Sequence, residues 1–62
     1  MKKKILIVSG GISKERLISL NTGLQVAKEL KKNSYNVKTS EPNKNLEKTI
    51  KKFKPDVIFN AL

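Results

Sequence analysis

The sequence predicts a small α/β domain, a three-layer β-α-β-α-β unit in which three parallel strands alternate with two helices. Two short apolar runs, at 5–8 and 57–59, are bounded by polar residues, as is typical of buried strands. Between them, apolar residues recur at steps of three and four, which indicates helices. Strands joined by helices pair in parallel through right-handed crossovers, and the simplest strand order is 2-1-3.

The first strand is predicted at residues 4–8, where four consecutive apolar residues follow three lysines. Gly10 and Gly11 end it, because glycine adopts positive φ readily and lets the backbone come close to a neighbouring group. After Ser13 the apolar spacing becomes helical. A strand, a tight turn and a helix place functional groups above the carboxyl end of a parallel sheet. We therefore expect any chemistry of this chain at that edge.

The first helix is predicted over about residues 15–32. Gly23 lies inside it and costs up to ~1 kcal/mol relative to alanine, unless it lets the helix pack closely on the sheet. Asn33 and Ser34 end the helix, and Asn33 is predicted to adopt the left-handed cap conformation. The apolar stripe of this helix is expected to contain Leu17, Leu20, Leu24, Ala27 and Leu30.

The second half of the chain continues the alternation. A short strand is predicted at 35–39, and a turn follows at 41–43, where Pro42 disfavours helix at the preceding residue. A second helix is predicted at about 45–53, and Pro55 prevents its continuation. We expect Tyr35, Val37 and Thr39 on one face of the strand, and Leu46, Ile50 and Phe53 in the buried stripe of the helix.

The predicted third strand, at 57–59, continues to residue 62 without a helix to cover it. Parallel sheets occur almost only with both faces covered. We therefore expect the chain to be the opening portion of a larger protein. The second explanation is self-association that hides the same apolar surface.

Composition excludes several kinds of site. The chain has no cysteine and no histidine, which excludes disulfides, thiolate metal sites and the usual neutral-pH base. Its longest apolar run is four residues, far below the ~20 needed to span a bilayer. The lysines at 2–4 are followed by too short an apolar stretch for a signal peptide. We expect a soluble, cytoplasmic protein without a membrane partner.

The net charge of +9 has two interpretations. Arg16 is the single arginine among 14 basic residues, whereas readers of nucleic acid tend to use arginine forks and stacked aromatic rings. Most of the lysines fall on predicted helices and turns. We therefore interpret them as a solvated surface and expect no nucleic-acid partner; the alternative is a basic nucleic-acid-binding domain with its lysines gathered on one face.

The diglycine turn matches neither common nucleotide-binding pattern. A dinucleotide fingerprint needs a third glycine at the helix start, and a P-loop needs Gly-Lys-Ser/Thr after the turn; both are missing. The helix N-terminus behind the turn still suits an anion, because it combines N–H groups with partial positive charge. Ser13 and Ser19 are interpreted as caps or local backbone partners.

Glu15 is the more informative residue of this segment. In the first turn of the helix its carboxylate complements the macrodipole, a contribution of ~0.3–1 kcal/mol. The functional alternative is that a carboxylate above the carboxyl edge of the sheet binds an ammonium group. The residues alone leave both interpretations open.

Residues 10–23, Gly-Gly-Ile-Ser-Lys-Glu-Arg-Leu-Ile-Ser-Leu-Asn-Thr-Gly, closely resemble the amino-terminal signature of D-alanine–D-alanine ligases. In that family a Gly-Gly pair, a Ser two residues on, a Glu and a Val-Ser-Leu-like step open the first helix. Residues 54–62, Lys-Pro-Asp-Val-Ile-Phe-Asn-Ala-Leu, look like the segment before the family's His-Gly pair. The similarity covers essentially the whole chain. Leu17 departs from a more usual polar residue, and Ile18 from a usual Val.

The resemblance implies an ATP-grasp ligase of three domains. Residues 1–62 would be most of the first, a Rossmann-like, pre-ATP-grasp substrate-binding domain that is incomplete at its C-terminal end. Such enzymes phosphorylate the carboxylate of one D-alanine with ATP, and the amine of a second D-alanine then attacks the acyl phosphate. The dipeptide enters peptidoglycan.

The resemblance also implies roles for two residues. Glu15 would be a catalytic and substrate-binding residue that holds the ammonium of the first D-alanine, and Ile18 would pack on its methyl group. ATP and Mg²⁺ would be bound by domains outside this chain, so the 62 residues alone are expected to be inactive. The full-length enzyme is expected to be a homodimer.

One further alternative stays open at this point. The chain could be a stand-alone, flavodoxin-like binding module that uses the helix N-terminus for a small anionic ligand. A dimer interface over the third strand would favour that alternative.

Overall fold

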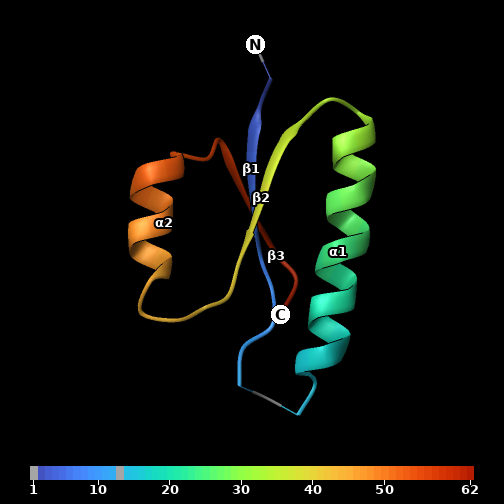
Figure 1. The fold of residues 1–62 in the computed structure, drawn as a ribbon, viewed down its shortest axis with the longest axis vertical. Helices are drawn as coiled ribbons and strands as arrows, with labels where there is room; N and C mark the ends of the chain where they lie inside the picture. The colour runs from blue at the N-terminus through green and yellow to red at the C-terminus, as the bar shows by residue number, and fades with distance from the viewer. Residues whose placement is uncertain (1, 13) are drawn as a thin grey trace.

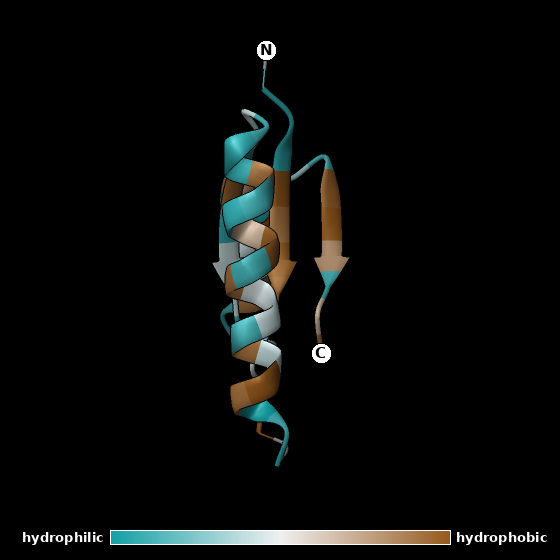
Figure 2. Cartoon of the chain, turned by 90° about the vertical axis from the view of Figure 1, so that its right-hand side faces the viewer, coloured by the Kyte–Doolittle hydropathy of each residue, from teal (hydrophilic) through white to brown (hydrophobic). Residues whose placement is uncertain are grey.

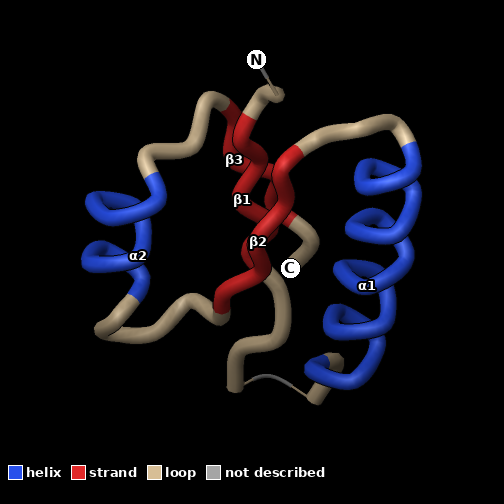
Figure 3. The backbone as a smooth tube through the Cα atoms, turned by 45° about the horizontal axis from the view of Figure 1, so that its top comes forward, coloured by secondary structure: helices blue, strands red, loops and turns tan. Residues whose placement is uncertain are grey.

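A computed structural model describes residues 2–12 and 14–62 of the chain. The elements follow the predicted order: β1 (Lys4–Val8), α1 (Arg16–Lys32), β2 (Asn36–Ser40), α2 (Leu46–Phe53) and β3 (Val57–Asn60). The strands form one parallel sheet of order β2-β1-β3, as predicted. The helices lie on opposite sides of this sheet (Figures 1 and 3), as two right-handed crossovers in opposite directions require. The predicted three-layer arrangement is confirmed.

The central strand β1 is the core of the molecule. Its residues from Ile5 to Val8 are all buried, because β2 and β3 flank the strand and the helices lie over its two faces. Side chains alternate between the faces of a strand. Ile5 and Ile7 accordingly pack with Ala27 of α1, and the half-buried residues around this cluster are Val26, Leu30, Val37 and Ala61.

The buried face of α1 differs from the predicted leucine stripe. Leu17 and Leu24 are 73% and 57% exposed, so their assignment to the core is wrong. The buried row is Ser19, Gly23 and Ala27, three small residues four apart. The small residues bring α1 close to the sheet, which confirms the expected reason for Gly23. Figure 2 shows hydrophobic and hydrophilic residues interleaved along α1, in front of the more uniformly hydrophobic β1.

The end of α1 also differs in detail. Asn33 keeps a negative φ of −93°, and Ser34 adopts the left-handed conformation at +68°, so the predicted cap is displaced by one residue. The Asn33 side-chain amide donates to the Glu29 carbonyl at 2.9 Å, four residues earlier, as a backbone N–H does within the helix. The Tyr35 N–H then donates to the Leu30 carbonyl at 3.1 Å, and β2 begins at Asn36 rather than at Tyr35.

The outer elements pack less tightly than β1. None of the eight described residues of α2 is buried, although its predicted stripe of Leu46, Ile50 and Phe53 is half-buried. The helix ends where Lys54 turns left-handed, at φ +51°, before Pro55. Ile58 and Phe59 of β3 are 50% and 41% exposed, so the third strand is open as expected. Across residues 2–12 and 14–62, neither helix has the length and apolar character to cross a membrane.

Candidate functional site

A hollow of about 320 Å³ lies at the carboxyl edge of the sheet. Four segments meet there: the turn after β1, the start of α1, the loop after β2 and the residues after β3. The lining residues are Gly10, Gly11, Ile12, Glu15, Ile18, Ser19, Pro42 and Leu62. The structure thus brings Glu15 and Ile18, the two site residues predicted from the sequence, into one hollow at the predicted edge.

Gly10 and Gly11, the diglycine turn after β1, line part of this hollow. Gly10 and Gly11 have φ values of +90° and +93°, so both need the conformational freedom of glycine. A Cβ at Gly10 would stand 2.7 Å from Oε1 of Glu41. Both positions therefore need glycine for their backbone conformation, and Gly10 is also needed because the Glu41 carboxylate comes so close to it.

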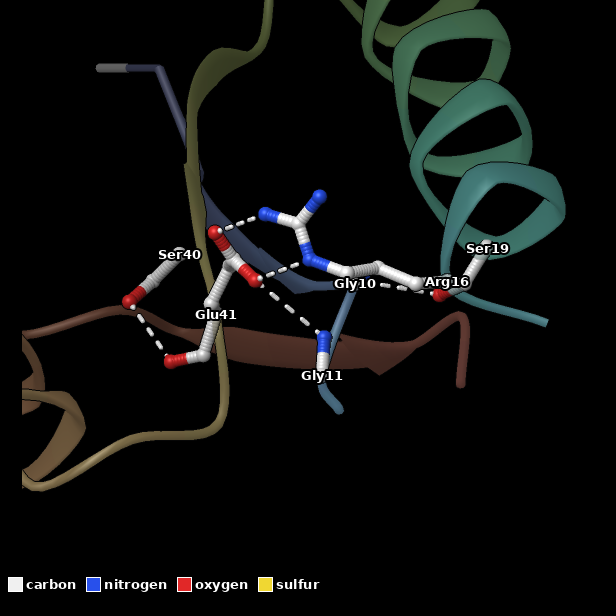
Figure 4. Close-up of polar contacts among 6 residues, drawn as sticks. All are labelled: Gly10, Gly11, Arg16, Ser19, Ser40 and Glu41. Atoms are coloured by element: carbon white, nitrogen blue, oxygen red, sulfur yellow. Dashed lines mark hydrogen bonds and ion pairs between the residues drawn. The ribbon is translucent and has the colours of Figure 1, made fainter. Parts of the chain in front are cut away.

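Glu41 is a functional candidate that the sequence analysis treated only as a turn residue. Its Oε1 accepts hydrogen bonds from the Gly11 N–H and the Arg16 Nε, both at 3.2 Å, and its Oε2 accepts one from Arg16 Nη2 at 2.8 Å (Figure 4). The Arg16 guanidinium, followed by the Gly11 N–H, lowers the pKa of this carboxyl. A sequence signal does exist, because parallel pairing puts the residues after β1 and β2 at the same edge.

Ser19 joins three segments that are distant in sequence. Its buried hydroxyl accepts a hydrogen bond from the Gly10 N–H at 2.8 Å and donates one to the Ala61 carbonyl at 2.7 Å. Its interpretation as a cap or local backbone partner is therefore wrong, since both partners lie outside α1. The same interpretation of Ser13 falls outside the described residues.

Glu15 is the N-cap residue of α1, one position before the first turn in which the sequence analysis placed it. It is exposed, and its backbone carbonyl accepts the Ser19 N–H at 2.9 Å. Ile18 lies about one helical turn further along and is also exposed, so its aliphatic side chain is accessible to a ligand in the hollow. A carboxylate and an aliphatic side chain in one small hollow suit a ligand that carries a cationic group beside a short apolar group.

The hollow does not have the groups that a metal or a phosphate requires. Among the described residues, no set of three or more His, Cys, Asp or Glu side chains could hold a metal ion. The Gly11 N–H of the diglycine turn donates to the chain's own Glu41. The residues present therefore fit neither Mg²⁺ nor the phosphates of ATP.

The described lysines do not gather on one face. They lie on α1 and α2, which cover opposite sides of the sheet, on β2, and in the segments at both edges of the sheet, including the amino edge. There Lys2, Lys3, Lys4 and Lys54 line a second hollow together with Asp56, which accepts the Lys4 N–H at 2.8 Å. This distribution is that of a solvated surface and does not favour a nucleic-acid site.

Comparison with known proteins gives the family. The chain is 77% identical to the D-alanine–D-alanine ligase of Pelagibacter ubique over all 62 residues, which are 20% of that protein. It is 47% identical to the ligase of Wolbachia sp. subsp. Brugia malayi over 94% of the chain and 17% of the relative. The ligase of Zymomonas mobilis is 39% identical over 98% of the chain and 19% of the relative. The chain belongs to the D-alanine–D-alanine ligase family.

The resemblance of residues 10–23 and 54–62 to the ligase family is thus confirmed. The chain spans about a fifth of the length of the curated ligases that it matches. No protein-family model matches the chain. No solved structure matches it either.

Proposed function

We propose that the chain is the amino-terminal, substrate-binding part of an ATP-dependent D-alanine–D-alanine ligase that makes the dipeptide for peptidoglycan. The observation that carries the proposal is the presence of Glu15 and Ile18 in one hollow. Identity to ligases along the whole chain supports it. The incomplete cover of β3 is consistent with a domain that continues in a longer protein.

In this proposal the hollow orients the first D-alanine. Glu15 pairs with its ammonium group, because a partly desolvated cation needs an opposite charge. Ile18 packs on its methyl group, which removes apolar surface from water. Two substituents of the Cα are then fixed, so the direction of the carboxylate is also fixed. Such orientation lowers the entropic part of an activation barrier.

ATP and Mg²⁺ supply the phosphoryl chemistry and are assigned to parts of the longer protein, since the hollow does not fit them. The 62 residues bind and orient substrate and are inactive by themselves. We further propose that the full-length enzyme is a cytoplasmic homodimer, as the family resemblance implies. Sedimentation of the full-length enzyme tests the dimer.

The decisive experiment is an assay of the full-length protein that carries this chain. With ATP, Mg²⁺ and D-alanine it is expected to form D-alanyl-D-alanine and to release one phosphate per dipeptide. L-alanine is the control substrate and is expected to give no dipeptide. A protein that binds D-alanine without forming dipeptide would contradict the proposal.

The alternative of a binding module for a small anion receives less support from the geometry. Its anion would bind at the N-terminus of α1, where Glu15 is the N-cap residue and the Glu41 carboxylate accepts hydrogen bonds from Arg16. Glu15 and Glu41 would also repel an anion in the hollow, although Arg16 offsets one of these charges.

A further inference from the structure

The loop between Gly11 and Arg16 carries Glu15 into the hollow. Its described residues Ile12, Lys14 and Glu15 are all exposed, and Ile12 is fully so. An apolar side chain in solvent does not anchor a loop to the core. The two ends of the loop, Gly11 and Arg16, are tied by hydrogen bonds to the loop after β2.

Both ends of this loop bind the same carboxylate. At one end the Gly11 N–H donates to Oε1 of Glu41, and at the other end Arg16 donates to both of its oxygens (Figure 4). An arginine that uses two N–H groups on a carboxylate fixes direction as well as distance. We call these three hydrogen bonds the Glu41 clasp.

The sheet register brings Glu41 to this position. Val8 of β1 pairs with Ser40 of β2, and the Ser9 N–H continues the ladder by donating to the Ser40 carbonyl at 3.0 Å. Glu41 therefore leaves β2 beside the turn that follows β1. The turn has room for the carboxylate because Gly10 has no side chain, as a Cβ there would collide with it.

Because the residues of the clasp are exposed, its effect on the position of Glu15 can be distinguished from its effect on the stability of the whole fold. The side chains of Arg16 and Glu41 are 44% and 38% exposed. Exposed ion pairs add little to global stability. The same hydrogen bonds nevertheless join both ends of a loop whose described residues are exposed.

We propose that Glu41 is a positioning residue of the D-alanine hollow, which holds Glu15 in place by fastening both ends of the loop between Gly11 and Arg16. The proposal rests on the proposed function of the hollow. Glu41 acts through Gly11 and Arg16, whereas Glu15 makes the contact with the ammonium group. Pro42, next in sequence, lines the hollow and is placed by the same clasp.

The test uses the full-length protein with three variants. Glu41→Ala removes the clasp, and Glu41→Gln keeps an oxygen for the Gly11 N–H but loses the charge that faces Arg16. The matched control is Glu47→Gln, because Glu47 also pairs with a neighbouring cation, Lys51 at 3.4 Å, and lies on α2 away from the hollow.

Glu41→Ala is expected to raise KM for the first D-alanine by about tenfold to a hundredfold, because a misplaced Glu15 makes a weaker ion pair with the ammonium group. KM for ATP is expected to change by less than about twofold, since the hollow does not fit ATP, whereas kcat is expected to fall because D-alanine is less well oriented. Glu41→Gln is expected to lose less than Glu41→Ala, and Glu47→Gln is expected to match the unaltered protein.

Three results would overturn the proposal: an unchanged KM for D-alanine in Glu41→Ala, an equal rise in KM for ATP, or a loss in Glu41→Gln as large as in Glu41→Ala. If Glu41→Ala does not fold, Arg16→Gln opens the clasp from its other side and is expected to raise the same KM.

Amide hydrogen exchange separates failure of the clasp from failure of the proposed function. Peptides that cover residues 10–18 are expected to exchange faster in Glu41→Ala than in Glu47→Gln, whether or not the protein makes dipeptide. Absence of dipeptide from the unaltered protein would reject the function alone. Unchanged exchange over residues 10–18 would reject the clasp even in an active ligase.

Discussion

Gly23 of α1 lies so close to Ser9 that a Cβ at position 23 would stand 2.7 Å from the Ser9 Oγ and 2.8 Å from its Cβ. Ser9 is buried directly after β1, so neither atom can move freely into solvent. This contact sets the distance between α1 and the sheet. It also explains why the larger leucines of α1 lie away from the closest approach.

Gly23→Ala is therefore expected to destabilise the chain, although alanine in an exposed helix position would gain up to ~1 kcal/mol. Overpacking costs about 1–3 kcal/mol, which exceeds that gain. The measurement is the urea midpoint of the 62-residue chain. Asn21→Ala, at an exposed position of the same helix, is the control and is expected to leave stability equal or slightly higher. A higher midpoint for Gly23→Ala would contradict the close contact.

Ser19→Ala is expected to lower stability through unpaired backbone groups rather than through lost apolar contact. The substitution leaves the Gly10 N–H and the Ala61 carbonyl without the Ser19 hydroxyl. A buried polar group left unsatisfied costs ~1–3 kcal/mol. Thr22→Ala is the matched control, because the Thr22 hydroxyl is exposed and donates to the Ile18 carbonyl of its own helix. Equal unfolding midpoints for the two variants would show that the Ser19 bridge is not formed.

The Glu41 clasp predicts a specific pH dependence of stability. Because the folded-state pKa of Glu41 is lowered from its ordinary value of 4.5, the ionised carboxylate favours the folded chain. Its contribution is fully present above that value and is lost as pH falls through the lowered pKa. Melting curves of the unaltered chain and of Glu41→Gln are expected to differ by a constant amount at neutral pH and to converge in acid. A difference that grows in acid would contradict the ion pair.

The open strand β3 predicts self-association of the 62-residue chain. Ile58 and Phe59 present apolar area at a strand with an unpaired edge, an arrangement that favours pairing with another copy. Sedimentation is expected to depend on concentration, and Ile58→Lys is expected to shift the chain toward monomer. Leu24→Lys on α1 is the control, since Leu24 is equally exposed but lies on a helix. Association that only Leu24→Lys abolishes would place the interface on α1.

The architecture was predictable because its signals are local. The continuous apolar run of β1, the positive-φ glycines and the alternation of strands and helices each follow from neighbouring residues. The buried face of α1 was not predictable in the same way. The predicted stripe shares only Ala27 with the buried row. Ser19 and Gly23 form that row with Ala27 at an equally regular spacing, and contact with Ser9 and Ile7 selects it.

The residues of the candidate site also fall into two groups, those that neighbouring residues predict and those that depend on distant segments of the fold. Glu15 and Ile18 could be predicted, because they lie in one short segment that resembles a ligase signature. Glu41 was missed, because its partners Gly11 and Arg16 lie 30 and 25 residues away and meet it through the β1–β2 register, which the sequence signals only as a shared sheet edge. The two partners of Ser19 likewise belong to other segments of the fold.

Glu15→Gln in the full-length enzyme tests the central assignment. Glutamine keeps the shape and a hydrogen-bond acceptor but loses the charge that would pair with the ammonium of the first D-alanine. Removal of one partner of a desolvated charge pair costs on the order of 2–5 kcal/mol, so kcat/KM for D-alanine is expected to fall by a corresponding factor. KM for ATP is expected to stay near that of the unaltered enzyme, since the hollow that contains Glu15 does not fit ATP.

Stability provides the contrasting measurement for Glu15. A carboxylate at the start of a helix contributes less than ~1 kcal/mol through the macrodipole, so the melting temperature of Glu15→Gln is expected to change little. Glu29→Gln, in the exposed pair with Lys32 at the other end of α1, is the control for a loss of charge without loss of substrate binding. If Glu15→Gln lowers stability and leaves the kinetics with D-alanine intact, Glu15 serves the helix dipole alone. The hollow would then lose its proposed cation partner.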